Sequence, residues 1–338
     1  MRSVIKYFII LCAVIVAANY VYIKSGLYEK DIKKCDGEFI FTIDSLSEVK
    51  EILYFAESSN FTTAKGDSSL ESISEILNRK LLENNIGTIN QAASHAGTYK
   101  KLIYRLKNKK VKTLIITMNL RSFGINWIES KLETNLSRTN IIYSGYPPLF
   151  KKFLLSFKGY DHKESFQRDR IVKRHYKDDI LFEQKGKFKS IRDWDSHMFS
   201  EGHKTKEGIR DAEKCELSSH FIKNYAFIIK ENNPRVQDFD DIINFCRTNR
   251  IKVVLNLLSE NYIKAKELCG EDLYALMKLN ASFLTERYKN KTLFINNLTL
   301  LKDSNFIDRL WPTEHYNYEG RNKIASNIAN QIQNGSTE

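Results

Sequence analysis

The sequence predicts an α/β protein with a parallel sheet covered by helices on both faces, one N-terminal transmembrane helix and an inserted cap region. Short apolar runs of strand length alternate with segments of helical apolar spacing over 49–338. A continuous apolar run lies near the N-terminus, and the stretch 120–213 is polar with few clear strands. We therefore divide the chain into a signal anchor (1–24), a linker (25–48) and one domain (49–338) with an insertion at about 120–213.

Each element of the domain follows from its own pattern, taken in chain order. The predicted strands are short apolar runs bounded by polar residues: 52–56 (ILYFA), 86–90, 111–118 (VKTLIITM), 251–257 (IKVVLNL) and 292–295. The predicted helices have apolar residues at helical spacing: 70–82, 99–106, 217–230, 238–248, 273–288 and 317–331. Ser68 and Glu71 form a capping-box pattern at the start of the first of these helices.

The N-terminal apolar run determines the predicted compartment. Arg2 and Lys6 precede this run, which covers residues 7–23 and would span about 25 Å as a helix. The positive-inside rule keeps the N-terminus in the cytoplasm and places the main domain outside. An uncleaved anchor is favoured over a cleaved signal peptide, for which 16–18 is a weak cleavage site, and over a buried core helix. We therefore predict a single-pass membrane protein.

Composition narrows the class of protein further. The 338 residues carry 53 Lys and Arg against 41 Asp and Glu, a net charge of +12, and 42% of them are hydrophobic. The apolar content excludes a disordered chain, and five Cys without a CxxC pair give no support for a disulfide scaffold or a zinc ribbon. The positive charge alone suits nucleic acid, an anionic membrane or an anionic polymer. The predicted extracytoplasmic location argues against nucleic acid as a partner.

Polar residues that suit acyl transfer follow the predicted strands, where open α/β sheets gather their active groups. Ser58, Gly97 and Asn119 follow the first, second and third predicted strands, and His315 precedes the last predicted helix. A hydroxyl, a glycine, an amide and an imidazole are the parts of a site with a nucleophile, oxyanion donors and a general base. Each of these residues also has a structural alternative, such as a helix cap or a turn.

This set of residues resembles the SGNH (GDSL-like) hydrolase superfamily. Ser58 takes the place of the nucleophile after the first strand, Gly97 that of the glycine whose N–H binds the oxyanion, and Asn119 that of the oxyanion asparagine. His315 is followed by Asn two residues on and Gly five residues on, which is the family spacing around the catalytic histidine. The resemblance implies a three-layer α/β/α flavodoxin-like fold, with Ser58 and His315 catalytic and Gly97 and Asn119 binding the oxyanion.

The chain also departs from the family pattern. Glu57 stands where the family has Asp before the nucleophile. The spacing from Asn90, at the end of the second predicted strand, to Gly97 is longer than is usual in the family. The family acid normally lies two or three residues before the histidine, where this chain has Pro and Thr. We assign the acid to Glu314, next to His315, and the alternatives are a backbone carbonyl or Asp308.

Two other serines compete with Ser58 as the nucleophile. Ser59 is the nearer rival, because it follows the same predicted strand. A literal Gly-Asp-Ser occurs at 66–68, but no strand precedes it, and Ser68 is better explained as a helix cap. Ser58 therefore remains the predicted nucleophile.

The resemblance implies a membrane-anchored esterase or O-acyltransferase that acts on an envelope glycan or surface polymer through a Ser–His acyl-enzyme. Anchored members of the superfamily work beside a multi-span membrane acyltransferase, so the resemblance implies such a partner. No metal or nucleotide cofactor is predicted, since the sequence has no GxxxxGK[ST], GxGxxG or HExxH motif. The alternative is a non-catalytic glycan-binding or scaffold component of a surface polysaccharide assembly machine.

Overall fold

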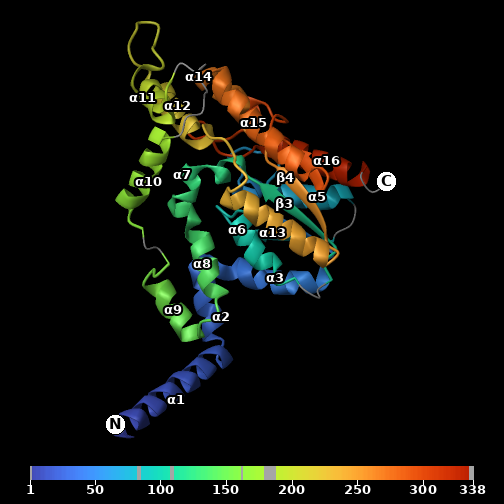
Figure 1. Cartoon of the computed structure of the whole chain (residues 1–338). Coiled ribbons are helices and arrows are strands. Elements are labelled where there is room, and N and C mark those ends of the chain that lie inside the picture. Colours follow the sequence, from blue (N-terminus) through green and yellow to red (C-terminus); the bar gives the residue numbers. More distant parts are fainter. Residues whose placement is uncertain (1, 82–84, 107–109, 161–162, 179–187, 335–338) are drawn as a thin grey trace.

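A five-stranded parallel sheet forms the centre of the molecule (Figure 1). The computed structural model describes residues 2–81, 85–106, 110–160, 163–178 and 188–334. The strand order is β2-β1-β3-β4-β5, with β1 (Ile52–Ala56), β2 (Ile86–Asn90), β3 (Thr113–Met118), β4 (Lys252–Leu257) and β5 (Leu293–Asn296). The predicted parallel α/β sheet is confirmed. Parts of the predicted anchor, first helix, insertion and domain lie outside the described residues, namely 1, 82–84, 107–109, 161–162, 179–187 and 335–338.

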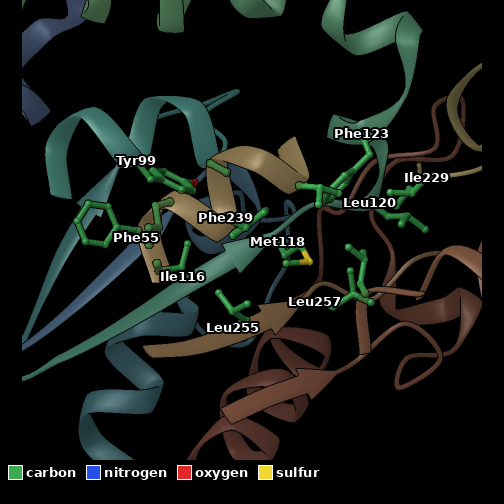
Figure 2. Packing of buried hydrophobic residues seen from close by; sticks show 14 of the residues in the cluster. Phe55, Tyr99, Ile116, Met118, Leu120, Phe123, Ile229, Phe239, Leu255 and Leu257 are labelled. Atoms are coloured by element: carbon green, nitrogen blue, oxygen red, sulfur yellow. The ribbon is translucent and has the colours of Figure 1, made fainter. Parts of the chain in front are cut away.

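Helices pack on both faces of the sheet, because successive strand residues point to opposite sides and both sides are apolar. On one face Phe55, Ile116 and Leu255 join the larger core cluster, together with Tyr99 and Phe239 from the helices above (Figure 2). That face is covered by α3 (Glu38–Val49), α6 (Ala96–Ile103), α13 (Pro234–Thr248) and α15 (Glu271–Tyr288). The other face is covered by α5 (Ile73–Leu81) and α16 (Tyr318–Asn334).

The predicted helices are present, but their starts are shifted by the capping residues. The capping box of α5 is formed by Ser72 and Glu75, so the assignment to Ser68 and Glu71 is wrong. The Ser72 N–H donates to Glu75 Oε2 at 2.7 Å, and the Glu75 N–H donates to Ser72 Oγ at 3.2 Å. α12 (Ala212–Tyr225) begins earlier than predicted because the Asp211 carboxylate caps it. These caps are local signals that apolar spacing alone does not locate.

The N-terminal segment forms one long apolar helix. α1 (Arg2–Lys24) is long and apolar enough to cross a membrane, and the window that meets this criterion has no residue buried inside the molecule. The predicted linker 25–48 is instead helical, with α2 (Leu27–Ile32), a π-helical turn (Lys33–Gly37) and α3. Phe39, Ile40 and Ile43 are buried in the larger core cluster. Their spacing places them on one helix face against the sheet, so this segment belongs to the folded domain.

The described part of the predicted insertion is mainly helical rather than irregular. It contains two short 3-10 helices (Leu120–Phe123 and Lys131–Glu133) and five α-helices: α7 (Ile125–Ile128), α8 (Thr134–Ile142), α9 (Pro148–Ser156), α10 (Ser165–Asp178) and α11 (Ile191–Glu201). Trp127, Ile142 and Trp194 reach the larger core cluster from these helices. Because each helix buries only a few side chains, its apolar periodicity is weak in the sequence. The chain returns to the sheet through α12 and α13, and α14 (Tyr262–Cys269) follows β4.

Candidate active site

Ser58 stands at the turn between β1 and a short helix, α4 (Ser58–Phe61). The Asn60 amide holds this turn in place, since its Nδ2 donates to Asn90 Oδ1 at 2.8 Å and its Oδ1 accepts from the Ser74 N–H at 2.8 Å. Ser58 is partly exposed, whereas its predicted rival Ser59 is fully buried. A substrate in solvent can therefore reach the Ser58 hydroxyl and cannot reach that of Ser59.

The structure brings Ser58 and His315 into direct contact, although 257 positions separate them in the chain. His315 Nε2 lies 2.9 Å from Ser58 Oγ. His315 Nδ1 lies 2.7 Å from Asp308 Oδ2, and the Thr313 hydroxyl donates to the same carboxylate oxygen. A proton on Nδ1 that is donated to Asp308 leaves the Nε2 lone pair free to accept the Ser58 proton. This hydrogen-bonded chain has the geometry of an activated hydroxyl.

The contact between Asp308 and His315 depends on the loop that joins β5 to α16. Phe306 and Tyr316 form an antiparallel bridge, and the Ile307 N–H donates to the His315 carbonyl at 3.1 Å. The bridge closes the loop, so that Asp308 and His315 face each other across its two ends. The Tyr316 hydroxyl donates to the Ser259 carbonyl at 2.8 Å and fixes the loop over the end of β4.

Glu314, the predicted acid, is turned away from the imidazole. Its buried carboxylate forms a two-pronged ion pair with the Arg121 guanidinium, which follows β3. Burial alone would raise the pKa of Glu314, but the charge and hydrogen bonds of Arg121 outweigh burial and lower this pKa. The assignment of Glu314 as the partner of His315 is therefore replaced by Asp308. The two neighbouring side chains thus have different partners, Arg121 for Glu314 and Asp308 for His315.

Two more buried glutamates lie near this ion pair. Glu57 Oε2 lies 2.9 Å from Ser58 Oγ, and Glu260 accepts a hydrogen bond from the Tyr225 hydroxyl at 2.6 Å. Burial raises the pKa of Glu57 and of Glu260, and the negative charge of Glu314 raises both further. Both carboxyl groups therefore hold a proton more readily than an exposed glutamate does.

The Asn119 side chain lies buried beside the end of β1 without a partner. Phe55 in β1 pairs with Ile116 in β3, so Ser58 and Asn119 each follow this pair by three residues on neighbouring strands. Within the described residues neither Nδ2 nor Oδ1 of Asn119 has a hydrogen-bond partner. Buried amides in proteins are nearly always hydrogen-bonded. The Asn119 amide is therefore available to an oxygen atom that enters the site.

Gly97 does not fit the oxyanion role predicted for it. Its N–H donates to the Nδ1 of His95, the capping residue of α6, at 3.1 Å. A side chain at position 97 would come within 2.9 Å of the Asp238 carboxylate, so the glycine allows α6 to approach α13. Burial, and next the charge of Arg235, lower the pKa of His95, so its ring is neutral and acts as a local hydrogen-bonding group. The structure places Gly97 at a helix junction.

Sequence reasoning missed a buried arginine that supports the site. Arg321 in α16 is fully buried and donates to the Tyr316 carbonyl at 2.6 Å, to the Ser69 carbonyl at 2.8 Å and to Asp67 Oδ2 at 3.0 Å. It thereby joins the loop before α5 to the segment that carries His315. Asp67 of the literal Gly-Asp-Ser has this structural role. An arginine in an amphipathic helix normally reads as exposed, so no sequence signal reveals Arg321.

The fold and the site together define a class of protein. It is a parallel α/β protein with a hydrogen-bonded Ser–His–Asp chain at the carboxyl edge of its sheet. No protein-family model and no curated protein matches the chain. Any assignment of activity therefore rests on the residues of this chain and their arrangement.

Proposed function

We propose that this chain is an SGNH-like serine esterase or O-acyltransferase with a three-layer fold, anchored by α1 and acting on an acylated envelope glycan or surface polymer. The observation that carries the proposal is the Ser58–His315–Asp308 chain of hydrogen bonds. This chain of hydrogen bonds lies at the carboxyl end of β1. In the strand order β2-β1-β3, the strand after β1 lies on one side of it, and the next strand lies on the other. Open α/β sheets bind ligands at such a reversal of strand order. From the resemblance we also propose a multi-span membrane acyltransferase as the partner.

In the first half of the proposed reaction, Ser58 Oγ attacks the carbonyl carbon of the acyl donor. His315 Nε2 takes the hydroxyl proton as the new C–O bond forms, and Asp308 stabilises the resulting imidazolium. Asn119 Nδ2 and the N–H groups at the start of α4 stabilise the negative oxygen, because the first amides of a helix have no partner within it. Breaking of the old ester bond transfers the His315 proton to the leaving alcohol and leaves an acyl-Ser58.

In the second half, water or a sugar hydroxyl attacks the acyl-Ser58. His315 Nε2 removes the proton of the attacking O–H group and then returns it to Ser58 Oγ as the acyl group leaves. Water as acceptor gives an esterase, and a sugar hydroxyl gives an acyltransferase. Exposed Trp311 lies in the same loop as Asp308 and His315, and its ring centroid is 3.8 Å from that of His220. An exposed aromatic ring in the loop of the candidate site suits contact with a sugar ring, which favours a glycan substrate.

The test of the proposed function is covalent labelling of Ser58. The full-length chain in detergent is treated with a fluorophosphonate probe, which forms a stable bond with an activated serine. We expect labelling of the parent and none of Ser58→Ala, since Ser58 supplies the nucleophilic oxygen. Ser59→Ala and Ser68→Ala are the matched controls and should label like the parent. A folded parent that takes up no probe would contradict the proposal and favour the non-catalytic glycan-binding or scaffold alternative.

Asn119→Ala is expected to lower kcat by about 10²–10³-fold, because it removes one donor to the oxyanion. Hydrolysis of p-nitrophenyl acetate by the full-length chain measures this change, and KM should change far less. The matched control is Asn126→Ala, the same exchange in α7. Equal kcat values for the two variants would exclude Asn119 from the oxyanion site.

A further inference from the structure

A continuous row of exposed aromatic rings runs along α9 and the residues that flank it. Tyr146, Phe150, Phe153 and Phe157 recur at the spacing of one helix face, and each is between 45% and 74% exposed. Their ring centroids are 5.3, 6.2 and 4.8 Å apart along the row. The opposite face of the helix packs into the domain through buried Leu155. An exposed aromatic row of this kind in a folded protein marks a surface that binds something apolar.

Contacts from the first half of α9 fix it beside the C-terminal end of α1 (Figure 1). The Leu149 N–H donates to Asn19 Oδ1 of α1 at 2.9 Å. The Lys152 ammonium pairs with Asp31 and lies 5.3 Å from the centroid of the Tyr22 ring. The exposed row therefore lies on a helix that contacts α1, and the apolar side chains of α1 are themselves exposed.

The position of Asn19 along α1 gives the depth of α9. The 23 residues of α1 extend about 34 Å as a helix, a little more than the roughly 30 Å hydrocarbon core of a bilayer. Asn19 precedes the helix end at Lys24 by five residues, or about 7.5 Å. If α1 is centred across a bilayer, Asn19 and the start of α9 lie about 5 Å below the boundary between acyl chains and headgroups. Interfacial helices bury their apolar faces about 5–10 Å deep at this boundary, where aromatic residues are enriched.

We propose that α9 is a second membrane contact, with its aromatic row inserted into the leaflet from which the C-terminal end of α1 emerges. The partner of this surface is the lipid bilayer itself. The inference rests on α1 spanning that bilayer and does not depend on the esterase activity. The spanning helix α1 and the interfacial helix α9 together hold the domain in one orientation over the membrane. With α1 as its sole membrane contact, the domain could rotate about the axis of that helix.

Quenching of a new tryptophan by brominated lipid tests this contact. Phe153→Trp is placed in the aromatic row, and Phe199→Trp is the matched control on α11, which lies far from α1 (Figure 1). Each full-length chain is reconstituted into phosphatidylcholine vesicles with and without bromine on the acyl chains. Emission of the parent, which has three tryptophans, is subtracted. We expect bromine to remove most of the added emission of Phe153→Trp and little of that of Phe199→Trp.

Two results would overturn the proposal. Equal quenching of both variants by water-soluble acrylamide, with no effect of bromine, would place the row in water. Protection of Phe153→Trp from both quenchers, together with a doubled particle mass, would assign the row to a second copy of the chain. A melting curve checks that each variant is folded, and Phe157→Trp replaces Phe153→Trp if the latter is not.

Discussion

Asp308→Asn is expected to lower turnover by about 10⁴-fold without weakening substrate binding. Asp308 Oδ2 lies 2.7 Å from His315 Nδ1, so its carboxylate holds the ring with Nε2 toward Ser58. An asparagine amide at this position can donate to Nδ1 and thereby favour the tautomer with its proton on Nε2. That tautomer has no lone pair facing Ser58 and cannot take the hydroxyl proton. The measurement is kcat and KM for p-nitrophenyl acetate with the full-length chain.

Asp303→Asn is the matched control for this exchange. Asp303 lies in the same part of the chain, is also partly exposed and pairs with Arg309 rather than with His315. We expect this variant to retain the kcat of the parent. Glu314→Gln distinguishes the two candidate acids, because Glu314 is bound by Arg121. A larger loss of kcat in folded Glu314→Gln than in Asp308→Asn would reverse the assignment of the acid.

Arg121→Met is expected to destabilise the fold by about 3–5 kcal/mol, because it leaves the buried Glu314 carboxylate without its partner. For a domain of this size the loss corresponds to a decrease in Tm on the order of 10 °C. The Tm is measured by circular dichroism on the full-length chain in detergent. Arg309→Met removes the exposed pair with Asp303 and should cost no more than about 1 kcal/mol.

The double variant Arg121→Met/Glu314→Met distinguishes the effect of an unpaired charge on Tm from the effect of altered packing. Two apolar side chains of similar volume leave no buried charge, so the double variant should regain most of the lost Tm. A double variant as unstable as Arg121→Met would show that packing, and not the unpaired carboxylate, causes the loss.

The pH dependence of Tm tests the charge of Glu314 in the same proteins. In the parent the pKa of Glu314 is lowered, so the ion pair adds stability above the unfolded pKa and loses it as pH falls through the folded pKa. In Arg121→Met the lone carboxyl is neutral once protonated, and acid relieves the cost of its burial. The difference in Tm between parent and variant should therefore shrink as pH falls from 7 toward 4.5, about the ordinary pKa of a glutamate. A difference that stays constant over this range would contradict a charged Glu314.

Sequence patterns were sufficient for the elements that carry the candidate site. A strand buried on both faces is a continuous apolar run, and its pattern does not depend on distant residues, so 52–56 and 86–90 match β1 and β2. The polar residues after these runs then lie at one edge of a parallel sheet. This explains why Ser58 and His315 could be paired from their order in the chain, although their catalytic roles stay a prediction.

Other features could not be predicted, because they depend on which distant segments pack together in the folded domain. Residues 25–48 are polar enough to suggest a linker. Ile40 and Ile43 are nevertheless buried, because α3 packs against β2 in the folded domain. Gly97 follows the correct strand, but the approach of α13 occupies its surroundings. Neither the docking of a helix nor the position of a capping side chain leaves a periodic signal in the sequence.

The apolar N-terminal helix, the parallel sheet, and a serine and a histidine at the edge of that sheet could all be predicted from the order of residues alone. The carboxylate that pairs with the histidine could be identified only in the folded molecule. Asp308 reaches His315 because the bridge between Phe306 and Tyr316 folds their loop back on itself. Glu314 instead forms an ion pair with Arg121, which follows β3. A strand depends on its own residues and their burial, whereas the partner of a charged side chain depends on distant segments that folding brings within a few ångströms.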